Sequence, residues 1–238
     1  MLEILKILLI AFFAVAVLLP VVRYMLRTIS PAKNASQMSA DELKYIQKQD
    51  LKLTIAYFFF ACVLAVFFAG TLALVSSIIH SGKGQMFLLT PNFNAMFAPG
   101  LLLGLVIALL PLRLIQSTLL GHDEELYKTY VHRTEGERSI RKYRLIFMML
   151  LVLASIVAWY SLRWHVVISE SGLEINNLLG EKRTYSHQEI KTIHYLGEEG
   201  KYLITFNDDS NINTSYLKPV QLEMIALLSE KSGHRVIR

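Results

Sequence analysis

Leu53–Ile79 reads LTIAYFFFACVLAVFFAGTLALVSSII, a stretch of apolar and small residues without a charged side chain. A helix needs about 20 such residues to cross the hydrocarbon core of a bilayer. Three further runs have a similar composition, at 4–22, 98–120 and 145–162. None of the runs contains Asp or Glu, and only Lys6 and Arg113 place a charge inside one. The sequence therefore predicts a bundle of four transmembrane helices.

Bulk composition agrees with a membrane protein. Of the 238 residues, 53% are hydrophobic, and the mean hydropathy is +0.41. The net charge of +5 comes from residues that flank the apolar runs, where membrane topology explains basic residues better than nucleic-acid binding does. We therefore expect no nucleic-acid partner. The single cysteine, Cys62, lies inside an apolar run and has no second cysteine with which to form a disulfide.

The first run is predicted to be a retained helix and not a cleaved signal peptide. Arg23, Tyr24 and Met25 follow it, where a signal peptide would have small residues at its cleavage site. The transmembrane domain is accordingly expected to span residues 1–163, with a separate water-facing domain at 164–238.

The distribution of Lys and Arg predicts the topology. Connectors 23–52 and 121–144 are both rich in basic residues, whereas 80–97 contains only Lys83. Short basic loops remain in the cytoplasm. Both connectors are therefore predicted to be cytoplasmic, which places the N-terminus and the C-terminal domain outside.

Three residues within the third run are candidates for special roles. Arg113 lies near the predicted cytoplasmic end, where its long side chain can reach the interface as a membrane anchor. The alternative is a functional intramembrane charge, although none of the apolar runs contains an acidic partner. Gly100 and Gly104 form a small-xxx-small pair, which permits close helix packing.

Local patterns refine these segments. Spacing of apolar residues before the second run predicts one continuous helix over 40–80. The loop around 86–97 mixes turn residues with aromatics, so we expect a short segment that dips into the outer membrane interface.

The hydrophobic period changes after Leu162. Apolar residues alternate over short segments that are separated by turn residues, as at Val166–Ile175 and Tyr202–Phe206. An amphipathic pattern follows Pro219 and ends near Gly233. The expected fold is a small α+β domain, with an antiparallel meander sheet of some six strands covered by one terminal helix.

This order of elements resembles the small PH-like domains at the ends of bacterial multi-pass membrane proteins of unassigned function. The matching segments are Val166–Ile175 (VVISESGLEI), Tyr185–Ile193 (YSHQEIKTI), Tyr202–Phe206 and the helix after Pro219. The resemblance implies a protein of the bacterial inner membrane. Because PH-like domains of this kind are usually cytoplasmic, it also provides an alternative to the outside placement.

No pattern in the domain predicts a catalytic, cofactor-binding or metal-binding site. His165 and His194 alternate with core residues and are expected to face solvent or a loop, and His187 is expected at the surface. Asp208 and Asp209 lack the spaced ligands of a calcium loop and are assigned to a hairpin turn. We expect no cofactor.

The function predicted from these features is that of a non-enzymatic membrane protein. Its partners are the lipid bilayer and another membrane or envelope protein, or a second copy of the chain. A regulatory, scaffold or accessory subunit would have this form. The alternatives are a self-protection or immunity-type membrane protein and a small transporter, although a transporter would need intramembrane acids or broken helix pairs.

Overall fold

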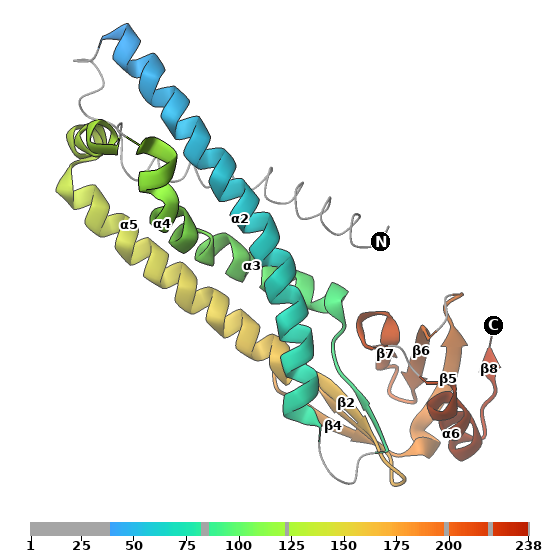
Figure 1. Ribbon diagram of the computed structural model, residues 1–238. Helices are drawn as coiled ribbons and strands as arrows, with labels where there is room; N and C mark the ends of the chain where they lie inside the picture. The colour runs from blue at the N-terminus through green and yellow to red at the C-terminus, as the bar shows by residue number, and fades with distance from the viewer. Residues whose placement is uncertain (1–38, 82–85, 122–123, 198–199, 219–220, 238) are drawn as a thin grey trace. The chain divides into compact units, whose positions relative to one another are not determined.

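The computed structural model describes residues 39–81, 86–121, 124–197, 200–218 and 221–237 (Figure 1). The predicted first span, 4–22, lies outside the described residues. Nothing in the structure therefore bears on the first of the four predicted helices.

Three helical segments of the described chain are long and apolar enough to cross a membrane: Lys48–His80, Phe93–Leu112 and Arg144–Arg163. The first is part of α2 (Ala40–His80), which is continuous over the range that the sequence predicts. The last is part of α5 (Glu124–Arg163). Neither helix contains proline, so no residue interrupts the hydrogen bonds between the polar connector and the apolar span.

The third apolar run differs from the single helix expected over 98–120. It forms α3 (Phe93–Ile107) and α4 (Leu109–Leu120), which are separated at Ala108. Pro111 has no N–H to donate to the carbonyl of Ile107, four residues earlier, so the regular bonding pattern is interrupted at this point.

The C-terminal region contains two four-stranded sheets. In the first sheet the strand order is β1-β2-β3-β4, and in the second it is β7-β6-β5-β8. The strands are β1 (Phe87–Leu89), β2 (His165–Ile168), β3 (Leu173–Asn176), β4 (Lys182–Tyr185), β5 (Ile190–Tyr195), β6 (Tyr202–Phe206), β7 (Asn211–Asn213) and β8 (Val236–Ile237). The terminal helix is α6 (Leu222–Ser232), which ends at Gly233 in the left-handed conformation.

The expectation of one meander sheet is therefore wrong in two respects. The chain changes sheet at the short 3-10 helix η3 (His187–Glu189), where Ser186 and Glu189 form a capping box. In addition, β8 pairs with β5 in parallel, whereas the other strand pairs are antiparallel.

The loop between α2 and α3 contains a strand that the sequence analysis did not predict. It contributes the strand β1, which pairs with β2 in the register Phe87↔Ile168 and Leu89↔Val166. Leu89 is 4% exposed and belongs to the core of the domain. A strand from the helical region thus completes the first sheet.

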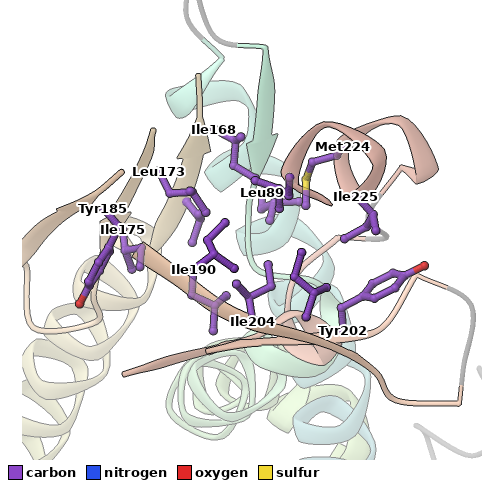
Figure 2. Packing of buried hydrophobic residues seen from close by; sticks show 14 of the residues in the cluster. Leu89, Ile168, Leu173, Ile175, Tyr185, Ile190, Tyr202, Ile204, Met224 and Ile225 are labelled. Atoms are coloured by element: carbon purple, nitrogen blue, oxygen red, sulfur yellow. The ribbon is translucent and has the colours of Figure 1, made fainter. Parts of the chain in front are cut away.

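A single hydrophobic core joins both sheets and α6 (Figure 2). Alternate residues of the strands supply it, as at Leu173 and Ile175 of β3 and Ile204 and Phe206 of β6. Because side chains alternate between the two faces of a strand, this spacing buries one face of each sheet. Met224, Ile225 and Leu228 of α6 complete the core.

The chain divides into two compact units. One contains Ala69–Pro99 and Val157–Arg238, so the C-terminal ends of α2 and α5 belong to the same unit as both sheets. The candidate site described next lies entirely within this unit.

Candidate functional site at the junction of helices and sheets

Partly buried polar contacts gather where the ends of the helices meet the first sheet. We call this region the junction, and it consists of four segments, 76–80, 90–92, 163–165 and 214–218. Its side chains come from α2, from the residues after β1, from the α5–β2 connection and from the residues after β7. The junction thus joins the ends of these helices to the C-terminal domain.

Lys218 donates a hydrogen bond through its Nζ to Ser77 Oγ in the last turns of α2. Ser77 Oγ also donates to the carbonyl of Ala73 at 2.9 Å and lies 3.0 Å from Thr90 Oγ1. Since a hydroxyl has one proton and two lone pairs, Ser77 accepts from both Lys218 and Thr90. The main-chain N–H of Lys218 donates to the carbonyl of Thr90 at 2.9 Å.

Asn92 makes the most extensive set of polar contacts at the junction. Its Oδ1 accepts from the N–H of Ala95 at 3.1 Å, as expected of an N-cap for α3. Its Nδ2 donates to the carbonyls of Ser215 at 2.8 Å and Leu217 at 3.0 Å. Its main-chain N–H donates to the carbonyl of Tyr216 at 2.9 Å.

His80 and His165 stack on one another, with ring centroids 3.9 Å apart and an interplanar angle of 29°. Each imidazole has its Nδ1 2.8 Å from a main-chain carbonyl, that of Ser76 for His80 and that of Arg163 for His165. Because a carbonyl only accepts, Nδ1 carries the proton in both rings. Burial lowers the pKa of His165 from its usual value, and nearby His80 lowers this pKa further, against the opposing effect of the Arg163 carbonyl.

The structure corrects the expected position of one histidine and adds a contact for another. His165 lies off the core face, as alternation requires, and is half-buried where it stacks on His80. His187, expected at the surface, is only 5% exposed. Its Nε2 lies 3.0 Å from the carbonyl of Ser169, and its Nδ1 has no hydrogen-bond partner among the described atoms. His194 is half-buried in β5.

Arg113, Gly100 and Gly104 lie outside the junction. Arg113 is in α4, and its side chain is not among those that the structure describes. Gly104 lies against α2, where a Cβ would be 2.5 Å from the amide nitrogen of Ala65. Gly100 is buried.

Asp208 and Asp209 occupy the turn between β6 and β7, the hairpin turn to which the sequence assigns them. The hydroxyl and amide of Ser210 bond to the Asp208 carboxylate and lower its pKa. Tyr185 also donates to this carboxylate at 3.0 Å. These contacts stabilise the turn.

The contacts of the junction hold the ends of the helices against the C-terminal domain. Lys218 contacts a hydroxyl, and the two imidazoles contact main-chain carbonyls. Within the described residues, no group of three or more His, Cys, Asp or Glu is placed to hold a metal ion.

Sequence reasoning missed the junction because its members are far apart in the chain. One local signal was available, since Asn92 immediately precedes the apolar residue that begins α3 and asparagine is a preferred N-cap.

Comparison of the chain with protein-family models, curated proteins and solved structures found no match.

Proposed function

We propose that this chain is a non-enzymatic integral membrane protein, a regulatory, scaffold or accessory subunit of the bacterial inner membrane. Its C-terminal domain contacts another membrane or envelope protein or a second copy of the chain. The transmembrane part has four helices, the three described spans and the run at 4–22.

The observation that carries this proposal is the contact between the domain and the helix ends. A domain on a flexible tether would move independently of the membrane helices. Here β1 pairs with β2, and Asn92 bonds to three carbonyls of the 215–217 segment. A partner that shifts the domain would therefore act directly on the ends of α2 and α3.

The architecture also supports assignment of the domain to the PH-like class. A C-terminal helix packs into the core of the domain, as the resemblance implies, although the core lies between two sheets and not under a single one. The strand β1, which comes from the helical region, and the parallel strand β8 are departures from a simple meander.

The pairing of β1 with β2 supports an outside location of the domain. Paired strands lie on the same side of a membrane, so the loop that contains Lys83 and the domain share one compartment. That loop is poor in basic residues, whereas 23–52 and 121–144 are rich in them. The positive-inside rule then favours the outside for both the loop and the domain.

The test is affinity purification of the tagged full chain from native membranes in mild detergent, with quantitative mass spectrometry. A membrane protein of similar size with the same tag serves as the control. We expect a stoichiometric protein partner, or a second copy, that is retained by Asn94→Ala and lost or weakened by Asn92→Ala. A chain that is monomeric and free of partners under crosslinking would contradict the proposal.

A further inference from the structure

The turn between β3 and β4 exposes two adjacent leucines. Leu178 is 46% exposed and Leu179 is 78% exposed. The turn itself is well formed, because Asn177 N donates to Glu181 O at 2.9 Å and Gly180 N donates to Asn177 O at 2.8 Å. An exposed pair of large apolar side chains at the tip of a hairpin requires an explanation.

The strand register places this tip beside the end of the transmembrane segment of α5. α5 ends at Arg163, and β2 begins at His165 (Figure 1). β3 runs antiparallel to β2 and ends with Asn176 opposite His165. The residues after Asn176 therefore continue past the start of β2, back towards the last turn of α5.

A direct approach between the two elements confirms this position. A Cβ on Gly180 would lie 3.8 Å from Nη1 of Arg163, so the tip and the last residue of α5 are neighbours. The guanidinium of Arg163 lies 5.5 Å from the centroid of the Trp159 ring. Trp159 and Tyr160 are 59% and 41% exposed, and exposed Trp, Tyr and Arg at the end of a transmembrane helix are typical of the headgroup region.

The turn at the other end of β3 has the opposite character. Between β2 and β3 the chain reads Ser169-Glu170-Ser171-Gly172, without a large apolar residue. Two basic residues, Lys182 and Arg183, follow the leucines at the start of β4. Lys182 forms an ion pair with Glu174, and Arg183 forms one with Glu181. The exposed leucines thus lie in the turn at the end of β3 beside α5, whereas the turn at the other end of β3 is polar.

We propose that Leu178 and Leu179 insert into the interfacial region of the membrane that α5 crosses, so that the β3–β4 turn anchors the domain to lipid. This inference rests on the transmembrane placement of α5 and not on the regulatory role proposed above. The apolar side chains leave water at the boundary of the acyl chains, while Lys182 and Arg183 remain at headgroup level.

The experiment uses the full chain with Cys62→Ala, reconstituted in vesicles of phosphatidylcholine and phosphatidylglycerol. An environment-sensitive fluorophore is attached at Glu181→Cys, next to the intact leucines, or at Ser171→Cys in the far turn as the matched control. Quenching is measured with nitroxide-labelled phosphatidylcholine and, separately, with aqueous iodide. We expect the probe at 181 to be quenched by the lipid nitroxide several-fold more than the probe at 171, and by iodide less.

Leu178→Ser with Leu179→Ser, in the Glu181→Cys background, should reduce lipid quenching towards the level at 171. An unchanged circular dichroism spectrum shows that the domain remains folded in this variant. Equal quenching at 181 and 171 would overturn the proposal. Protection of the probe at 181 from both quenchers would also overturn it, because protein and not lipid would then cover the tip.

Discussion

Asn92 serves two structures at once, as the N-cap of α3 and as the donor to the 215–217 segment. Asn92→Ala removes the side-chain bonds of both roles, and loss of an N-cap alone costs about 1 kcal/mol. We expect a lower melting temperature in detergent, measured by circular dichroism. Asn94→Ala is the matched control, because Asn94 is exposed in the first turn of the same helix. Equal melting temperatures for the two variants would argue against the role of Asn92.

His165 predicts a pH dependence of stability. Its pKa is lowered in the folded state, so the folded state favours the neutral ring. The resulting contribution to the free energy of unfolding is present above the usual histidine pKa of about 6.5. It is lost as the pH falls through the lowered folded pKa, when the ring becomes charged beside His80. Glu174 and Lys182 act on the same ring with opposite effects.

The melting temperature of the wild-type chain should therefore fall between pH 7 and pH 5 more than that of His165→Phe, which retains an aromatic ring for stacking. His234→Phe is the control, because His234 is exposed. A pH dependence that is the same in all three chains would show that the stack contributes nothing to it.

At the scale of elements, the absence of a side chain at Gly104 allows α3 to pack closely against α2. Gly104→Ala would place a Cβ 2.5 Å from the main-chain nitrogen of Ala65, and backbone cannot rotate aside as a side chain can. We expect destabilisation of about 1–3 kcal/mol, as for other overpacked cores, measured by thermal unfolding in detergent. Gly70→Ala in α2 is the control, because its Cβ would lie at an ordinary 3.9 Å from Phe93.

The strand β1 predicts how the isolated domain behaves. Residues 164–238 alone lack β1, which exposes the edge of β2 and removes Leu89 from the core. We expect this fragment to melt broadly or to aggregate. Adding residues 86–92 through a flexible linker should restore a sharp transition in circular dichroism. A sharp transition without residues 86–92 would show that β1 is dispensable.

Elements with a strong local pattern could be predicted from the sequence. The continuous helix over 40–80 and the alternating strands at 166–175 and 202–206 follow from spacing alone, and the structure confirms them. The three-residue strand β1 could not be predicted, because its partner β2 is distant in the chain. The contacts of Lys218 and Asn92 depend on the same long-range pairing, so the junction could not be predicted either.

For the whole molecule, the paired strands predict that two distant points share one side of the membrane. A reporter inserted after Lys83 and a reporter fused at Arg238 should therefore agree. We expect alkaline phosphatase to be active and green fluorescent protein to be dark at both positions, with the opposite pattern in connector 121–144. If green fluorescent protein were fluorescent and alkaline phosphatase inactive at both positions, the domain would lie in the cytoplasm and not outside. Disagreement between them would contradict the β1–β2 pairing itself.

The pairing of β1 with β2 also sets an order of events during synthesis. The ribosome makes β1 before the helices α3, α4 and α5, so the strand has no partner until the chain beyond α5 has emerged. Until then the edge of β1 remains unpaired, and unpaired edges are sites of aggregation and proteolysis. We expect chains that end before His165 to be degraded faster in pulse-chase experiments than the full chain. Synthesis of β2 therefore removes an exposed edge that an earlier segment of the chain leaves open.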